Sequence, residues 1–349
     1  ALVNTKHRTI FIGLIVGLGA VFVLSLALGS VSIPLRDVVT ILLGGEGTRS
    51  TYTTIILNFR LTKAITAALA GAALGVSGLI MQTLFRNPLA DPYVLGISSG
   101  ASLGVAFVVL LAGTTGTTLL AGVGLLGDFA LIAASSIGAA SVLILILIAA
   151  RRVSGTMTLL ILGLMFGYAA SALVSLLIHF SVADRIQTYI SWTFGSFGGV
   201  TWGQMPLYAA GLLIGLGSAN LSAKPLNALL LGDVYARSMG LDVRRVRMWL
   251  ISSAALLTGI ITAFCGPIGF LGVAVPHLCR VMLGTSDHRI LLPAVTITGA
   301  ALAMIADIIA QAPGTATVLP LNAITALFGA PVVLWVILRR RDVRETFAS

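Results

Sequence analysis

Long stretches without Asp, Glu, Lys or Arg divide this chain of 349 residues. A helix needs about 20 mostly apolar residues to cross the hydrocarbon core of a membrane, and several of these stretches are longer than that. They are continuously apolar rather than alternating with period two, which argues against a membrane β-barrel. The stretches run over residues 9–35, 64–85, 92–127, 129–150, 153–183, 186–223, 248–279, 290–306 and 308–338.

Gly, Pro and Ser breaks inside the longer stretches mark positions where the chain can turn. Dividing the stretches at these breaks predicts ten transmembrane helices in an all-α polytopic membrane protein. We expect residues 1–349 to form a single transmembrane domain. The predicted helices cover residues 9–30, 62–83, 92–112, 129–150, 156–178, 204–219, 248–266, 269–284, 290–311 and 323–338.

Composition supports the membrane assignment. Charged residues make up 9% of the chain, compared with about 25% in a soluble domain. Hydrophobic residues make up 58%, and the mean hydropathy is +1.06. A soluble fold of this size could not bury so much apolar surface. High apolar content excludes a disordered chain, and two cysteines exclude a disulfide-rich secreted scaffold.

The net charge of +10 indicates topology. If both termini are cytoplasmic, 16 of the 21 lysines and arginines lie on the inner side. Such an asymmetry is typical of membrane proteins and favours an even number of spans. The expected surroundings are membrane lipid, and no basic domain is present to bind nucleic acid. Five basic residues remain outside: Arg36, Arg49, Arg60, Lys63 and Arg185.

Residues 220–247 form a long cytoplasmic segment that holds five basic and two acidic residues, yet about half of it is apolar. This composition predicts short helices that pack against something. One interpretation is a loop folded back on its own helix bundle. The other is a docking surface for a cytoplasmic partner.

Enzyme motifs are weak in this sequence. None of the three lysines, Lys6, Lys63 and Lys224, follows a glycine, so the chain lacks a P-loop and any ATP hydrolysis would occur on another chain. Residues 96–100 match the G-x-S-x-G string of hydrolases, but they lie at a membrane helix, where small residues favour close helix packing. An intramembrane protease using Ser98 would need a histidine at matching depth, and none is predicted there.

The sequence predicts no metal site and no bound cofactor. Cys265 and Cys279 lack a C-x-x-C spacing and are expected to be inert buried thiols, and His277 is expected to be structural.

Two polar features remain open to interpretation. Asp307 lies inside a predicted span, where a carboxylate is costly. It could form a hydrogen bond or ion pair with a neighbouring helix, or act as the coupling group of a proton-coupled secondary transporter. The sequence indicates no second charged residue in the spans to complete a proton relay. Residues 86–92, RNPLADP, predict a rigid cytoplasmic elbow that could also form a gate at a pore mouth.

Residues 71–104, GAALGVSGLIMQTLFRNPLADPYVLGISSGASLG, resemble the permease subunits of type II ABC importers, the FecCD family that imports iron-siderophore complexes, haem and cobalamin. Further stretches resemble family motifs in the same order, so the resemblance covers essentially the whole chain. These stretches are residues 192–199 (WTFGSFGG), 226–241 (LNALLLGDVYARSMGL), 266–280 (GPIGFLGVAVPHLCR), 306–307 and 327–331 (LFGAP).

The resemblance implies ten transmembrane helices in the inner membrane of a bacterium, with both termini in the cytoplasm. It also implies a second permease, identical or paralogous, two ATPase subunits that bind ATP and Mg, and an extracytoplasmic substrate-binding protein. The implied function is import of a ferric-siderophore-like chelate by alternating access, with haem and cobalamin as alternative cargoes. The chain itself would not be an enzyme.

The resemblance also implies roles for individual residues. Asn87, Leu89 and Thr156 match positions of a cytoplasmic gate, and Arg60 and Lys63 match positions that meet the binding protein. The sequence departs from the family pattern at Thr62, at Gln311 and in residues 318–322, where the family commonly has Pro, Arg and E-L-P-x-G. The residues expected to couple to the ATPase are Leu226, Leu230, Gly232, Asp233, Ala236, Arg237, Gly240 and Leu241.

Overall fold

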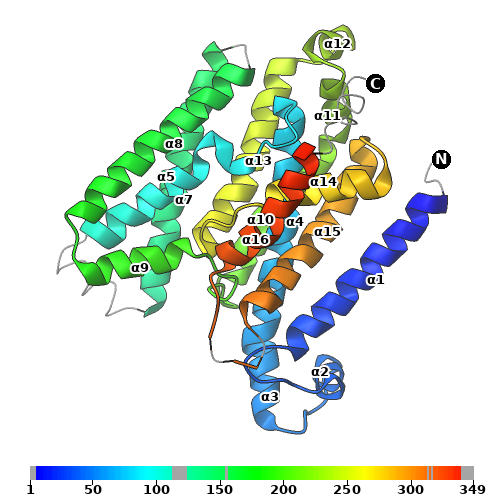
Figure 1. Cartoon of the computed structure of the whole chain (residues 1–349), viewed down its shortest axis with the longest axis vertical. Coiled ribbons are helices and arrows are strands. Elements are labelled where there is room, and N and C mark those ends of the chain that lie inside the picture. The colour runs from blue at the N-terminus through cyan, green and yellow to red at the C-terminus, as the bar shows by residue number, and fades with distance from the viewer. Residues whose placement is uncertain (1–4, 112–123, 154–155, 313, 316, 339–349) are drawn as a thin grey trace.

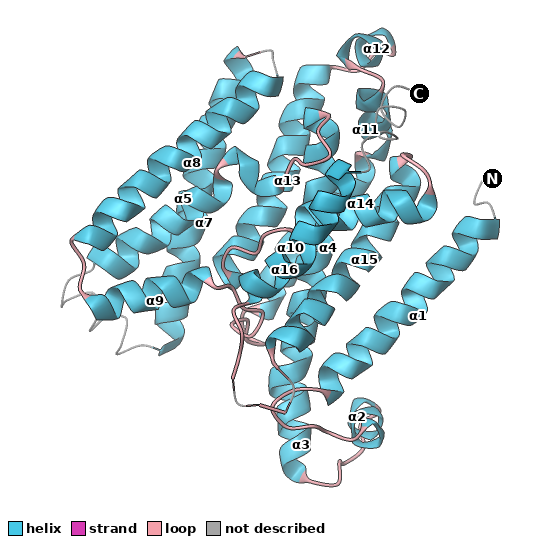
Figure 2. Cartoon of the chain, viewed as in Figure 1, coloured by secondary structure: helices cyan, strands magenta, loops and turns pink. Residues whose placement is uncertain are grey.

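The computed structural model describes residues 5–111, 124–153, 156–312, 314–315 and 317–338. These residues form helices joined by loops, with no strand in the ranges described (Figures 1 and 2). The helices are α1 (Thr5–Ala27), α2 (Leu35–Leu42), α3 (Ser50–Thr54), η1 (Ile55–Arg60), α4 (Leu61–Phe85), η2 (Pro92–Leu95), α5 (Ile97–Ala106), η3 (Phe107–Leu111), α7 (Gly124–Arg152), α8 (Thr156–His179), α9 (Ala183–Thr193), α10 (Met205–Leu221), α11 (Ala223–Leu230), α12 (Asp233–Ser238), α13 (Val243–Cys265), α14 (Leu271–Leu283), α15 (His288–Ala310) and α16 (Leu321–Leu338).

Each of the ten predicted ranges overlaps a helix of the structure, and the all-α membrane fold is confirmed. Six helices in the described ranges are long and apolar enough to cross a membrane. A seventh span results if α10 and α11, which are bent by 51° relative to one another, are counted together. The apolar helices α5, α14 and α16 are shorter in their described parts. Ten membrane spans therefore stay a prediction.

The helix α4 lies at the centre of the bundle and packs against α13, α14 and α15 (Figure 1). Glycines make these contacts close. A Cβ atom on Gly78 would lie 1.8 Å from the carbonyl oxygen of Gly272, and one on Gly71 would lie 2.1 Å from that of Gly299. These distances leave no room for any side chain, so the backbones touch directly. Glycines on both sides thus let α4 approach its neighbours closely.

The G-x-S-x-G string also serves packing. Gly96 has a positive φ of 75° and ends η2, and a Cβ atom there would lie 2.8 Å from the carbonyl oxygen of Gly163 on α8. A Cβ atom on Gly100 would lie 2.6 Å from the carbonyl oxygen of Gly138 on α7. The glycines of this string thus seat α5 between α7 and α8, as the packing interpretation expects.

The two ends of the molecule carry different helices (Figure 1). The beginning of α1 lies toward the same end as α11 and α12, and the last described turns of α16 point toward it (Figure 1). The helices α2 and α3 lie at the opposite end (Figure 1). This arrangement agrees with the prediction that the termini and residues 220–247 share one side of the membrane.

Candidate coupling segment, gate turn and outer ion pair

Residues 220–247 fold into α11 and α12 and the turns around them. We call residues 223–241 the coupling segment. One face of α11 is buried on the bundle through Leu226 and Leu229, which are 0% and 3% exposed, against α4 and α15. The part of the coupling segment after α11 exposes apolar side chains to the exterior. They are Leu231, Val234, Tyr235 and Met239, and each is at least half exposed.

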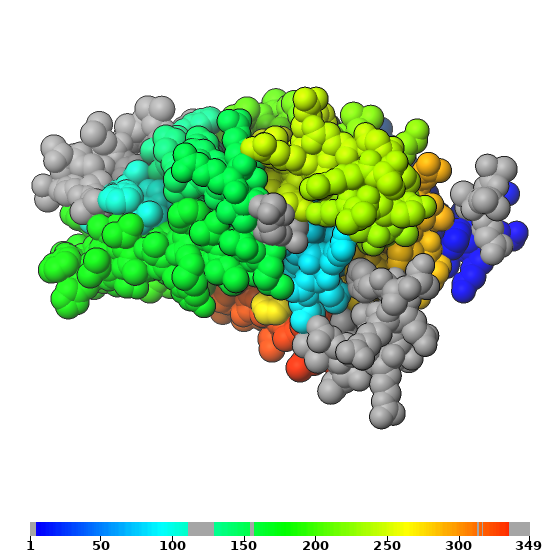
Figure 3. All heavy atoms as spheres, turned by 90° about the horizontal axis from the view of Figure 1, so that it is seen from above, coloured from blue at the N-terminus to red at the C-terminus, as the bar shows by residue number. Residues whose placement is uncertain are grey.

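Figure 3 views the molecule from this end, where the yellow-green atoms around α12 cover part of the surface beside the light-blue atoms that end α4. A hollow of about 580 Å³ lies between the two, lined by residues that include Leu84, Arg86, Val234 and Tyr235. The interpretation of a loop folded back on its own bundle therefore holds for one face of the segment, and docking of a partner on the other face stays a prediction. One face folds back on the bundle, and the other offers an apolar surface with a hollow.

The predicted coupling residues fall into two groups. Leu226 and Ala236 are fully buried, so they fix the segment to the bundle. Gly232 and Gly240 have φ values of 112° and 84°, a backbone conformation that favours glycine, and they form the turns before and after α12. The remaining predicted residues are partly or fully exposed: Leu230, Asp233, Arg237 and Leu241.

Asp233 begins α12 and holds this helix to two others. Its Oδ1 lies 3.4 Å from the guanidinium of Arg86, which follows α4. Its Oδ2 accepts a hydrogen bond from Arg247 of α13 at 2.8 Å. The carboxylate therefore links α12 to both α4 and α13.

The gate turn, residues 86–91, starts with Arg86 at a φ of 47°, which ends α4. The side chain of Asn87 accepts a hydrogen bond from the backbone N–H of Leu89 at 3.0 Å. Asp91 accepts one from Tyr93 at 2.8 Å and so caps η2. Asp91 therefore caps the next helix, whereas Asn87 closes a turn within the segment and caps no helix.

Leu89 lines a hollow of about 480 Å³ together with Asp91, Phe270 and Val333. Leu89 and Asp91 of the gate turn therefore line a mostly apolar hollow, and Asn87 is bonded to Leu89 beside it. The third predicted gate residue, Thr156, begins α8, and its side chain lies outside the part of the chain that the structure describes. The gate role of these three residues stays a prediction.

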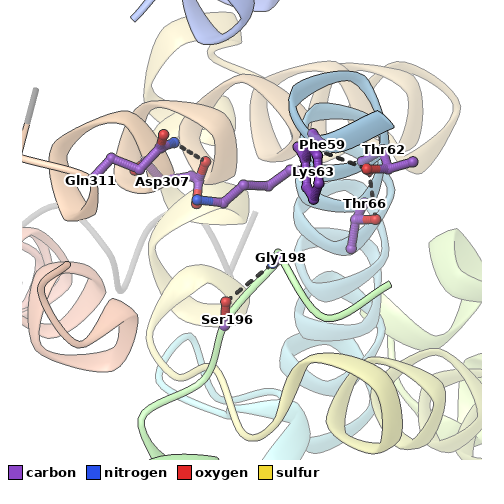
Figure 4. A network of polar contacts seen from close by, with 8 residues as sticks. All are labelled: Phe59, Thr62, Lys63, Thr66, Ser196, Gly198, Asp307 and Gln311. Carbon is purple, nitrogen blue, oxygen red and sulfur yellow. Dashed lines mark hydrogen bonds and ion pairs between the residues drawn. The ribbon is translucent and has the colours of Figure 1, made fainter. Parts of the chain in front are cut away.

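At the other end of α4, Lys63 forms an ion pair with Asp307 of α15, with 3.0 Å between Nζ and Oδ1 (Figure 4). Gln311 donates a hydrogen bond to the second carboxylate oxygen at 2.7 Å (Figure 4). The side chains of Lys63 and Asp307 are 21% and 8% exposed. The ion-pair interpretation of Asp307 is confirmed. The sequence had not indicated the partner, Lys63, which reaches Asp307 from the first turn of the neighbouring helix.

Arg60 also has its hydrogen-bond partners within the chain. Its guanidinium donates to the carbonyl oxygens of Leu26 and Ala27 at 2.8 and 2.9 Å, and to that of Val31. Two of these contacts reach carbonyl oxygens in the last turn of α1, where a cation is favoured. Arg60 is only 9% exposed. Arg60 and Lys63 thus both lie at the outer end of α4, each with an intrachain partner, and a role in docking a binding protein stays a prediction.

Sequence reasoning missed several polar residues that join distant elements. Asn322 lies in the first turn of α16 and donates to the carbonyl oxygens of Thr193 and Pro267 at 2.9 and 2.6 Å. Its side-chain oxygen accepts from the N–H of Gly269 at 3.0 Å. Two of the recognised motifs, residues 192–199 and 266–280, therefore meet at this one amide. The signal available in the sequence was that an Asn stands where the family has Gly.

No group of three His, Cys, Asp or Glu side chains in the described ranges could hold a metal ion. Cys265 and Cys279 are free and buried, as expected for inert thiols.

Comparison with known proteins gives a consistent result. A model of the FecCD transport family matches residues 15–339. The vitamin B12 import system permease protein BtuC of Klebsiella pneumoniae is 41% identical over 286 residues, which cover 82% of this chain and 83% of that protein. The same-named protein of Escherichia coli is 37% identical over 286 residues, which cover 82% of this chain and 84% of that protein.

A solved structure has the same fold. It shows an inward-facing conformation of an ABC transporter assigned to the metal-chelate type, and it superposes with a TM-score of 0.82 at 25% identity. The match covers 95% of this chain and 99% of that one. The chain described here therefore belongs to the FecCD transport family, as a multi-pass permease of the ABC-importer type.

Proposed function

We propose that this chain is the membrane-spanning subunit of an ATP-driven importer in the bacterial inner membrane, moving a metal chelate into the cytoplasm by alternating access. The observation that carries the proposal is the coupling segment. Its inner face is fixed to α4 and α15, while its outer face exposes Val234 and Tyr235 beside a hollow. Exposed apolar surface of this kind is typical of a protein-binding site. A motor subunit docked there could move the bundle.

The proposed cargo is a corrinoid such as cobalamin, because the relatives at 41% and 37% identity are named for vitamin B12 import. A ferric-siderophore-like chelate, the cargo expected from the sequence, is the second candidate. We include the siderophore in the test because the structural neighbour is assigned to the metal-chelate type. Both cargoes are large and polar, and both suit a pathway with few fixed charges.

The proposed assembly contains a second permease, identical or paralogous, two cytoplasmic ATPase subunits that bind ATP and Mg, and an extracytoplasmic binding protein. At the outer face, Arg60 and Lys63 would have to exchange their intrachain partners for carboxylates of the binding protein. For Lys63 this exchange would release Asp307, so docking and the outer ion pair would compete.

Transport by the purified assembly tests the proposal. The tagged chain is purified with the subunits that accompany it and reconstituted in liposomes, and uptake of radiolabelled cyanocobalamin and of a ferric siderophore is measured with and without ATP. We expect ATP-dependent cobalamin uptake and no ATP hydrolysis by the isolated chain. Uptake of the siderophore alone would change the proposed cargo. Uptake driven by a proton gradient without ATPase subunits would refute the proposal and favour a secondary transporter using Asp307.

A surface substitution tests the docking face separately. Val234 on α12 is 84% exposed, so Val234→Glu should not disturb the fold but should place a charge in the proposed interface. We expect it to abolish co-purification of the ATPase. Val318→Glu is the matched control, since Val318 is 69% exposed and precedes α16, away from the coupling segment. Equal loss of the ATPase in both variants, or in neither, would contradict a docking role for α12.

A further inference from the structure

A buried hydrogen-bond network connects the coupling segment to the end of α4. Its centre is His288, the first residue of α15, which is 1% exposed. One ring nitrogen, Nδ1, lies 2.7 Å from the side-chain oxygen of Asn227 on α11. The other, Nε2, lies 2.8 Å from the hydroxyl of Thr83 on α4. Three helices that are distant in sequence therefore meet through one imidazole.

The donors and acceptors fix the orientation of each group. The side-chain oxygen of Asn227 also accepts the backbone N–H of His288 at 2.9 Å, and its amide nitrogen donates to Asp287 at 2.6 Å. A flipped amide would set its N–H groups against a donor and its oxygen against a carboxylate. Nδ1 of His288 must therefore carry a proton. In the neutral ring, Nε2 then accepts from the Thr83 hydroxyl, whose single proton is shared with the carbonyl oxygen of Leu79, 2.9 Å away within α4.

Thr83 continues the network into the gate turn. Its backbone carbonyl accepts the N–H of Arg86 at 3.2 Å, and the preceding carbonyl, of Gln82, accepts the N–H of Asn87 at 3.1 Å. These two bonds end α4. The side chain of Asn87 then holds the N–H of Leu89 at 3.0 Å. Hydrogen bonds and the short backbone stretch of residues 82–87 thus connect α11 to the predicted gate.

We propose that Asn227, His288 and Thr83 are positioning residues that transmit displacement of the coupling segment to the gate turn. This inference rests on the proposed function, in which an ATPase moves that segment. Apolar contacts such as those of Leu226 are not directional and allow helices to slide. Buried hydrogen bonds fix the register, because separating them leaves polar groups unpaired inside the protein. The helices α11, α15 and α4 consequently move together at this end.

The second link between the segment and the gate turn is weaker. The ion pair of Asp233 with Arg86 spans 3.4 Å, and its two side chains are 39% and 47% exposed. Exposed pairs of this kind contribute little, since water screens them and both side chains are mobile. The network around His288 is buried and short, so it is the stiffer connection.

The test measures how many ATP molecules the reconstituted assembly hydrolyses for each cyanocobalamin it imports. Thr83→Val removes the hydroxyl and keeps the shape of the side chain, and Asn227→Ala removes the amide at the other end of the network. Thr83→Ser restores the hydroxyl. Thr66→Val is the matched control, because the Thr66 hydroxyl is buried in the same helix and donates within it, to Thr62 at 2.8 Å.

We expect Thr83→Val and Asn227→Ala each to raise the ATP-to-cobalamin ratio about fivefold, a coupling of the size usual between linked sites. The ATPase should still co-purify and hydrolyse ATP. Because both residues act in one series, the double variant should raise the ratio no further than either single variant. Thr83→Ser and Thr66→Val should keep the wild-type ratio.

The outcomes separate the two proposals. A wild-type assembly without ATP-dependent uptake would overturn the proposed function. A working wild-type assembly in which Thr83→Val and Asn227→Ala keep its ratio would overturn the transmission role alone. So would an equal rise in Thr66→Val, or a failure of Thr83→Ser to restore the ratio, since either would show a general packing defect.

Discussion

Replacing Lys63 with methionine removes the cation of the outer ion pair and keeps most of the side-chain volume. In this variant the carboxylate of Asp307, which is 5% exposed, loses the ammonium and keeps the hydrogen bond from the amide of Gln311. Removing one partner of a fully buried ion pair typically costs about 3–5 kcal/mol. Lys63 is 21% exposed at its side chain, so water screens part of the interaction. We therefore expect Lys63→Met to lower the free energy of unfolding by about 2–3 kcal/mol.

The partner substitution should cost less. Asp307→Asn can still accept the hydrogen bond from Gln311, and the ammonium of Lys63 can turn toward water, so we expect about 1 kcal/mol. The double variant removes both charges, so neither is left buried without its partner. Its cost should fall below the sum of the single costs by about 1–2 kcal/mol, which is the interaction energy of the pair.

Unfolding in mixed detergent micelles, followed by tryptophan fluorescence, measures all four proteins of this cycle. Lys224→Met is the control, because Lys224 is an exposed lysine on α11, and surface substitutions usually change stability by less than about 0.5 kcal/mol. If the cost of the double variant equals the sum of the two single costs to within about 0.5 kcal/mol, the ion pair contributes no significant interaction energy and the reasoning is refuted.

Three further outcomes follow from packing and hydrogen bonding. Gly78→Ala, whose Cβ would meet a backbone oxygen at 1.8 Å, should lower the free energy of unfolding by at least about 2 kcal/mol or prevent folding. Gly13→Ala, whose Cβ would meet no atom within 4 Å, should be neutral or mildly stabilising, and thermal unfolding of the two variants measures the difference. Asn322→Ala removes three side-chain hydrogen bonds and should lower stability by about 2–4 kcal/mol, and an unchanged melting temperature would contradict its role as a junction. The hydroxyl and backbone N–H of Thr48 lower the pKa of Asp37 in the outer loop. A depressed pKa stabilises the fold above the ordinary value, so the stability advantage of the wild type over Asp37→Asn should shrink as the pH falls from about 5 to 3.

The sequence predicted the helices well because a membrane imposes a simple rule on them. Each span needs about 20 apolar residues, and a charged residue interrupts it visibly. The charge-free stretch 64–85, for example, ends with α4, at Phe85. The same rule predicts less for η2 and α5, where the chain turns at Gly96 inside one apolar stretch. There the backbone conformation of a glycine, rather than hydropathy, divides the helix.

The polar contacts could not be predicted in the same way. Lys63 and Asp307 were both recognised as unusual, yet as separate features, because hydropathy gives no rotation of one helix relative to another. Asn227 lay within a recognised motif and was passed over, because its partners, Asp287 and His288, come from another helix. A residue's type shows what it could bind, and only the packing shows which group lies opposite.

The two polar networks acquire a common meaning from the helices that they join. Lys63 and Asp307 connect α4 to α15 at the outer end, and Thr83 and His288 connect the same two helices at the inner end. Between them, Gly71 and Gly299 bring the two backbones into direct contact. Helices held together at three levels resist bending and sliding relative to one another. A displacement that enters at α11 would therefore tilt α4 and α15 as one body. The motion would reach the outer ion pair while the contacts between the two helices stay unchanged.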